Sequence, residues 1–227
     1  RQLVKRDALP VEVVREICTQ AHLANIARRA DDLGQLTTYL RALPDEERGN
    51  RVALAAARSL AALNAEVEAQ KLIETVLEAS DDDAWAPKLV SIYGRLAAGD
   101  QMVRIAKAEA WLRRHPKDAS ILLALGRMCF RKRLWGKAQT YLEASLALEP
   151  SHRTHLALGE LFRQLGRDAE ASAHLAAALK LAVAVLGCGL VMTMGAARAQ
   201  DDDEDDKTFE EKIIDSLMSG IGATNME

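Results

Sequence analysis

Five cationic side chains and one tryptophan gather around a single predicted turn in the middle of the sequence. They are Arg127, Arg131, Lys132, Arg133, Trp135 and Lys137. Guanidinium groups bind carboxylates through charge-assisted hydrogen bonds, so this cluster could contact an acidic partner or a propionate-bearing tetrapyrrole. A solvated turn is the alternative, because cations are also favoured at the C-terminal end of a helix. We treat these six residues as candidate partner contacts. For the tryptophan, packing within the helices is the alternative role.

The histidines are the candidate ligands for a haem iron. There are five of them: His22, His115, His152, His155 and His174. His152 and His155 are three residues apart near a predicted helix start, so their side chains can share one face of that helix. An apolar pocket around either would suit an axial haem ligand, whereas exposed histidines near a loop are the commoner arrangement. No Cys-x-x-Cys-His or His-Glu-x-x-His motif accompanies them.

The sequence lacks the motifs of the common enzyme classes. It has no nucleophile elbow, P-loop or dinucleotide-binding glycine run. Three consecutive acids, residues 81–83, would point in different directions on a helix, which favours a helix cap over a metal site. The cysteines at positions 18, 129 and 188 are far apart and odd in number, which favours free thiols over disulfides or a zinc site. We therefore predict a non-enzymatic protein without catalytic residues, a resident cofactor or a metal.

The stretch Asp118–Pro150 positions the basic cluster, and its pattern recurs along the chain. It contains two apolar-periodic segments joined by the basic turn, and a second copy follows at once. Gly126 and Gly159 are 33 residues apart, as are Ala138 and Ala171. Such a period is typical of helix-turn-helix units that stack around a shared core, and small residues at these positions let paired helices cross closely.

Weaker copies of this pattern precede the central stretch. Helices are expected over residues 9–29, 33–43, 44–63, 65–80, 85–96 and 101–114, with Asn64 in a tight connection. Alanine and leucine dominate, aromatic residues are only 4% of the chain, and no segment of alternating β-branched residues supports a sheet. The predicted fold class is all-α, a helical repeat solenoid of antiparallel helix pairs over residues 1–180.

The charge is distributed unevenly along the chain. Of 30 basic and 33 acidic residues, 27 basic and 23 acidic ones lie in residues 1–180. A net charge of +4 over that length is too small for a nucleic-acid-binding surface, so we expect protein partners and no nucleic acid.

The repeat pattern resembles the tetratricopeptide repeat (TPR), most clearly over 119–150 and 152–183. The runs Leu134–Ala138 and Tyr141–Leu146, within a longer likeness over about 30–180, resemble the bacterial HemY family. That resemblance implies a membrane-anchored TPR scaffold, with its repeats on the cytoplasmic face of the inner membrane, that binds enzymes of late haem biosynthesis. It also implies an N-terminal membrane anchor upstream of Arg1. A haem- or porphyrin-binding carrier and a generic envelope adaptor remain alternatives.

The C-terminal part of the sequence does not follow the repeat. Residues 181–197 contain no charged side chain, and Ala197-Arg198-Ala199 precedes a run of acids. Residues 181–199 therefore have the pattern of a secretory signal peptide joined to the repeats, with a short transmembrane helix or a capping helix as alternatives. Residues 200–227 are predicted to be an acidic disordered linker followed by a short amphipathic helix from Phe209 to Ile221.

Overall fold

All regular elements in the part of the chain described by the computed structural model are helices, as predicted. It describes residues 10–80 and 84–197, with side chains as far as residue 184. The elements are α1 (Val11–Ala27), α2 (Leu33–Ala42), η2 (Asp45–Glu47), α3 (Asn50–Ala62), α4 (Glu66–Ala79), α5 (Pro87–Tyr93), α6 (Gln101–Arg114), α7 (Ala119–Arg131), α8 (Trp135–Leu148), α9 (His152–Gln164) and α10 (Asp168–Ala197). Internal contacts divide the chain between Ala182 and Val183, and the helix pairs below belong to the first unit.

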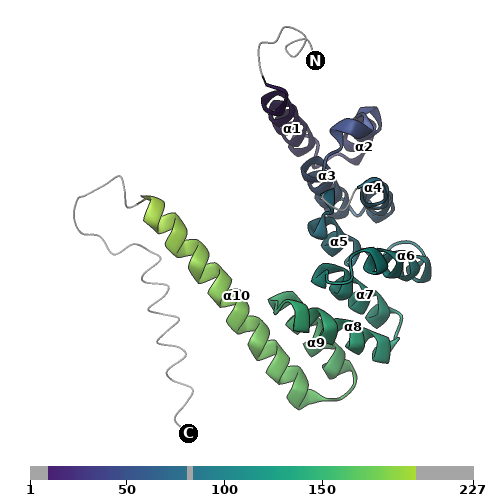
Figure 1. Ribbon diagram of the computed structural model, residues 1–227, viewed down its shortest axis with the longest axis vertical. Coiled ribbons are helices and arrows are strands. Elements are labelled where there is room, and N and C mark those ends of the chain that lie inside the picture. Colours follow the sequence, from purple (N-terminus) through teal and green to yellow (C-terminus); the bar gives the residue numbers. More distant parts are fainter. Residues whose placement is uncertain (1–9, 81–83, 198–227) are drawn as a thin grey trace, which may run out of the picture. The chain divides into compact units, whose positions relative to one another are not determined.

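The helices of the first unit form two layers (Figure 1). In one layer α1, α3, α5, α7 and α9 pack each against the next. Helices α4, α6 and α8 lie against this odd-numbered layer, with α3–α4 and α7–α8 as closely packed hairpins. This arrangement follows from the repeated apolar faces, because each helix pair can bury its apolar side chains only by stacking on its neighbours.

The predicted close crossings at small residues are confirmed. A Cβ atom added to Gly126 would lie 2.5 Å from side-chain carbons of Leu142 on α8, and one added to Gly159 would lie 2.9 Å from those of Leu175 on α10. Ala138 is fully buried and Ala171 nearly so. The two copies therefore use the same contact to bring their paired helices together.

Polar side chains cap several helices, and one predicted helix is interrupted. Asp32, Asp118 and Ser151 each accept a hydrogen bond from a backbone N–H of the helix that follows. The expectation of one continuous helix over 44–63 is wrong, because a single 3₁₀ turn after Pro44 is followed by Gly49 and then by α3. The predicted cap at 81–83 lies outside the described residues.

Besides Gly99 (φ 79°) between α5 and α6, three turns between paired helices contain a residue in the left-handed conformation. Asn64, Arg133 and Gly166 have φ angles of 58°, 57° and 72°. Each lies between the two helices of a pair, and Arg133 and Gly166 are 33 residues apart. Asparagine and glycine adopt this conformation readily, whereas arginine is strained in it. The backbone at Arg133 is therefore set by the repeat rather than by its own side chain.

This strain predicts that Arg133→Gly stabilises the protein. Relief of the left-handed conformation outweighs the extra entropy of an unfolded glycine, so the free energy of unfolding should rise by about 0.5 kcal/mol. Urea unfolding measures it. Lys132→Gly is the control, because Lys132 has an ordinary φ of −85° and glycine there should only destabilise. Equal destabilisation by both substitutions would contradict the prediction.

The connection between α5 and α6 departs from the regular repeat. Helix α5 ends early, at Tyr93, and the following loop is held by side chains from three other helices. Arg104 is fully buried and donates to the carbonyl oxygens of Tyr93, Leu96 (2.7 Å) and Ala98 (3.1 Å). The carboxylate of Glu66 accepts from the backbone N–H groups of residues 97 and 98, both at 2.7 Å. Side chains thus supply the hydrogen bonds that a longer helix would have made.

The predicted boundary after residue 180 falls inside a helix. The backbone of α10 is continuous from Asp168 to Ala197. Among the helices of the described residues, none has both the length and the apolar character needed to cross a membrane. Residues 198–227, and with them the predicted linker and amphipathic helix, lie outside the described residues.

Candidate functional site

The candidate site is a pocket of about 460 Å³ where α7, α8 and α9 meet the α5–α6 connection. We call it the arginine groove. It is lined by Arg95, Arg127, Phe130, Arg131, Leu142, Leu156, Ala157 and Glu160. The basic side chains come from the odd-numbered layer and its loop, and Leu142 of α8 is fully buried beneath them. The groove thus combines three guanidinium groups with an apolar wall.

Arg127 carries the unusual charge of this groove. Its side chain is half-buried, and no described residue forms an ion pair or hydrogen bond with it. Burial, and then repulsion from Arg95, Arg153 and Arg131, lower the pKa of Arg127 to about 10, against a smaller opposing effect of Glu160. The guanidinium therefore stays protonated at neutral pH, in a site that disfavours its charge.

Arg131 has a structural role in the same groove. Its guanidinium donates to the carbonyl oxygens of Gly94 (2.8 Å) and Leu96 (3.0 Å) at the end of α5. Burial lowers the pKa of Arg131. Because its Nη2 group holds the α5–α6 connection, Arg131 is less free than Arg127 to reorient toward a ligand, although it adds positive charge to the groove.

The other four predicted contact residues do not line the groove. Lys132 and Arg133 are exposed in the turn between α7 and α8. Trp135 is half-buried and packs edge-on against Phe130, with ring centroids 5.5 Å apart. Lys137 lies 3.6 Å from Glu109 of α6, in the even-numbered layer. The predicted cluster is therefore split between two surfaces, and only Arg127 and Arg131 enter the groove.

Sequence reasoning missed Arg95 and Glu160, although the repeat contains the signal for both. Arg95, Arg127 and Glu160 each follow the glycine of their repeat, namely Gly94, Gly126 and Gly159. The glycine faces a neighbouring helix, so the next residue is turned by about 100° toward the side of the helix where the groove lies. Equivalent positions in successive repeats therefore line one surface.

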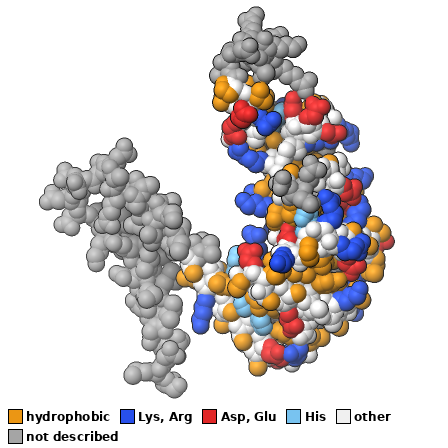
Figure 2. Space-filling model, viewed as in Figure 1, with side chains coloured by type: hydrophobic (Ala, Val, Ile, Leu, Met, Phe, Trp, Pro, Cys, Tyr) orange, Lys and Arg blue, Asp and Glu red, His pale blue; other side chains and the backbone are white. Residues whose placement is uncertain are grey.

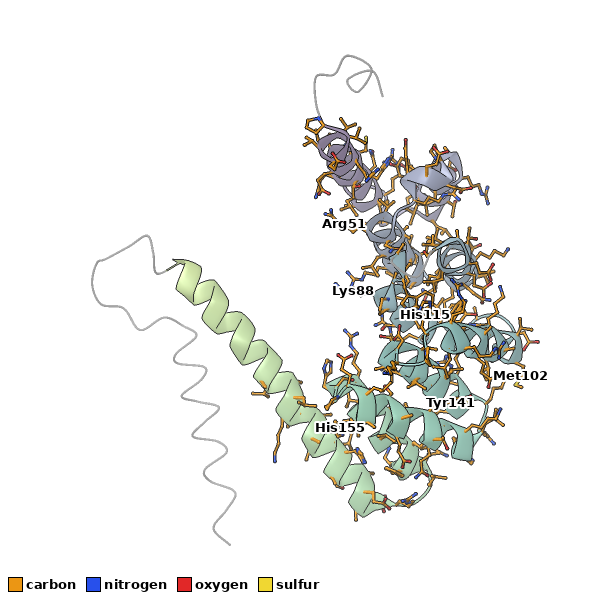
Figure 3. All side chains as sticks on the ribbon, in the orientation of Figure 1. Arg51, Lys88, Met102, His115, Tyr141 and His155 are labelled. Atoms are coloured by element: carbon orange, nitrogen blue, oxygen red, sulfur yellow. The ribbon has the colours of Figure 1, made fainter. Side chains whose placement is uncertain are left out.

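Of the two candidate haem ligands, His155 is paired with a histidine of the next helix. Nδ1 of His155 on α9, a residue labelled in Figure 3, lies 2.9 Å from Nδ1 of His174 on α10. The ring centroids of Phe162 and His174 are 5.3 Å apart. His152 makes no such contact among the described residues. Burial, and then the charge of His174, lower the pKa of His155. Within the described residues no group of three or more His, Cys, Asp or Glu side chains is arranged to hold a metal ion.

This pair predicts that the last helix pair loosens in mild acid. One Nδ1–H···Nδ1 hydrogen bond requires a neutral acceptor ring, and the folded pKa of His155 lies below its unfolded value of about 6.5. The stabilisation is fully present above about pH 6.5 and is lost progressively as the pH falls from that value toward the lower folded pKa, because the unfolded chain then binds more protons.

The prediction is tested by measuring the hydrogen-exchange protection of backbone amides in α9, and in α10 up to Ala182, from about pH 7.5 to 5. His155→Gln should remove most of the acid-induced loss of protection, while His152→Gln should not. Glu170, which forms an ion pair with Arg167 and is close enough to be affected by the charge of His174, must be varied in parallel as Glu170→Gln. If the acid-induced loss of protection persisted in His155→Gln, the loss would have to come from other titratable groups.

The free cysteine within the core has no reactive character. Cys129 is fully buried on α7, and burial raises the pKa of its thiol to about 11. A thiol at that pKa is protonated at neutral pH and is a poor nucleophile. Cys18 is also free, whereas the side chain of Cys188 lies beyond the described residues.

Comparison with known proteins identifies the fold and no closer relationship. No family model and no curated protein match this sequence. Among solved structures, TTC0263, a thermophilic TPR protein in Thermus thermophilus, is 21% identical, covers 81% of this chain and 99% of its own, and superposes with a TM-score of 0.56. The MamA RS-1 ArsTM double mutant is 16% identical, with coverages of 83% and 98% and a TM-score of 0.50. The chain has a TPR-like helical repeat fold.

The TPR-like fold explains why the groove lies on the odd-numbered layer. Stacked helix pairs create one continuous surface from equivalent helices, so residues of successive repeats lie next to one another on it. On the face in Figure 2 basic, acidic and apolar side chains are interspersed over the first unit. This surface shows no single basic stripe of the kind that follows a nucleic-acid backbone.

Proposed function

We propose that this protein is a non-enzymatic protein–protein interaction scaffold that binds a segment of a partner in the arginine groove. One observation carries the proposal: Arg127 holds a half-buried charge without a described partner, beside an apolar wall on the odd-numbered layer. A guanidinium in this setting gains strongly from a carboxylate supplied by another molecule.

The partners we propose are enzymes of late haem biosynthesis at the cytoplasmic face of the bacterial inner membrane. This part of the proposal rests on the resemblance of residues 134–146 and their surroundings to the HemY family. The haem-carrier alternative has less support, because Nδ1 of His155 is engaged by Nδ1 of His174.

Site-specific photo-crosslinking in the host cell tests the scaffold function. A photo-reactive phenylalanine derivative would be placed at Leu156, which lines the groove and is 47% exposed. The control position is Val67 on α4, which is 45% exposed and outside the groove. Discrete protein adducts are expected from position 156 only, and Arg127→Glu should abolish them. Identical adducts from both positions would overturn the scaffold proposal.

The haem-related part of the proposal is tested by two separate measurements. Mass spectrometry of the adducts at position 156 should identify tetrapyrrole-synthesising enzymes, and deletion of the gene should make porphyrin intermediates accumulate. Adducts without any such enzyme, together with unchanged porphyrin levels, would remove the haem assignment and leave the scaffold function in place.

A further inference from the structure

The arginine groove has a chemical asymmetry that restricts what it can bind. Its positive end is formed by Arg95 and Arg127, with Arg153 close enough to act on the charge of Arg127. Its other side is formed by Phe130, Leu142 and Ala157. Neither the guanidinium of Arg95 nor that of Arg153 forms an ion pair or hydrogen bond with a described residue. Positive charge and apolar surface therefore adjoin within one pocket.

The positive end matches a carboxylate better than a neutral group. Two unpaired guanidinium groups, Arg95 and Arg127, repel each other in the free protein, and one bound carboxylate would offset that repulsion for both. Their guanidinium donors are not engaged by described residues, whereas Nη2 of Arg131 already holds the α5–α6 connection. Arg127 is therefore the guanidinium placed to form a new charge-assisted pair.

The apolar side matches a hydrocarbon side chain next to that carboxylate. Leu156 is 47% exposed although it borders the fully buried Leu142, so apolar surface remains open to solvent at this point. A pocket of about 460 Å³ accommodates one acidic and one apolar side chain, but not a folded domain. Covering Leu156 adds binding energy that the carboxylate alone does not provide.

Glu160 disfavours a nucleic acid as the ligand of the groove. Its carboxylate lines the same groove, one repeat further along than Arg127. A continuous run of phosphates would bring negative charge against it, whereas a peptide can present a backbone N–H or a cationic side chain there. The groove is therefore matched to a peptide of mixed character rather than to a nucleic acid.

We infer that the arginine groove recognises an internal peptide segment in which an aspartate or glutamate side chain is adjacent to a large apolar side chain. The inference rests on the proposed scaffold function and specifies the partner's chemistry. Arg127 pairs with the carboxylate, Arg95 adds to its attraction, and Leu156 and Phe130 contact the apolar side chain.

Fluorescence anisotropy with synthetic peptides and the full chain tests the inference. The probe is a fluorescein-labelled, C-terminally amidated peptide with Asp-Leu flanked by Gly and Ser residues. Matched peptides carry Asn-Leu, Asp-Ser or Lys-Leu in its place. The Asp-Leu peptide should bind, and each replacement should weaken binding at least about tenfold, the effect expected of one lost charge-assisted pair or one lost apolar contact.

Protein variants separate recognition from folding. Arg127→Gln should weaken binding of the Asp-Leu peptide at least about tenfold while leaving the thermal unfolding midpoint unchanged or higher, because it removes an unpaired charge. Lys132→Gln, a change in the same predicted basic cluster but outside the groove, should alter neither property. A loss of binding by Arg127→Gln that accompanies a lower unfolding midpoint would overturn the recognition role.

Other outcomes would overturn the inference in distinguishable ways. Equal binding of the Asp-Leu and Asn-Leu peptides would exclude carboxylate recognition, and a requirement for a free C-terminal carboxylate would exclude an internal segment. Arg127-dependent binding of a fluorescent single-stranded oligonucleotide in preference to the peptide would assign the groove to nucleic acid. If crosslinking from Leu156 still captured specific proteins, the inference would fail while the scaffold function stood.

Discussion

Replacing Arg104 by alanine is expected to lower the free energy of unfolding by about 3–5 kcal/mol. The side chain is fully buried, and its guanidinium donates to three carbonyl oxygens of the α5–α6 connection. Its substitution would remove this donor from the oxygens of Tyr93 and Ala98, whereas that of Leu96 would keep the hydrogen bond from Arg131. It would also open a void beside the ring of Tyr93, over which the guanidinium lies at 4.5 Å from the centroid. Urea unfolding followed by circular dichroism measures the loss.

Two further variants separate the causes of this loss. Arg104→Met keeps most of the volume and should recover part of the stability, leaving mainly the cost of unpaired carbonyl oxygens. Arg113→Ala is the matched control on the same helix, because Arg113 is exposed in the last turn of α6 and should change stability by less than about 0.5 kcal/mol. Similar losses for Arg104→Ala and Arg113→Ala would show that the buried hydrogen bonds add little.

The helix pairs could be predicted from the sequence because their signals are local and repeated. Apolar periodicity, the 33-residue spacing and the small residues at Gly126 and Gly159 all point to stacked pairs, and the structure confirms them. The early end of α5 could not be predicted in this way. Its loop is stabilised by Glu66 and Arg131, which are more than 30 residues away in sequence, and by Arg104 on the next helix. None of the three has a local signature of its carbonyl or amide partner.

Only part of the candidate site could be predicted from the sequence, because its contacts also lack a local signal. A charge cluster in sequence is not a cluster in space, because successive residues of a helix and its turn face different directions. Arg127 and Lys137, ten residues apart, end on different layers, whereas Arg95 and Arg127 line the same groove from different repeats. Comparing equivalent positions across repeats would have found the residues that follow each glycine. Counting the charged residues along one turn could not have found them.

Gly94→Ala is expected to destabilise the protein by about 3 kcal/mol, the upper end of the range for overpacking. A Cβ atom at this position would lie 2.6 Å from the Cα and Cβ atoms of Ala124 on α7. Backbone cannot rotate away, so α5 and α7 would have to separate. Gly126→Ala should cost less, about 1 kcal/mol, because the nearest atoms there belong to the side chain of Leu142, which can adopt another rotamer.

The double variant Gly94→Ala with Ala124→Gly tests whether this contact sets the spacing of the repeats. Removing the Cβ atom of Ala124 relieves one of the two clashes, and the clash with its Cα atom remains, so recovery should be partial. Separation of α5 from α7 would also move Arg95 away from Arg127, because Arg95 follows Gly94 directly. Gly94→Ala should therefore weaken binding of the Asp-Leu peptide, and the double variant should restore part of it. Full binding by Gly94→Ala despite lost stability would show that the groove does not depend on the spacing of these two helices.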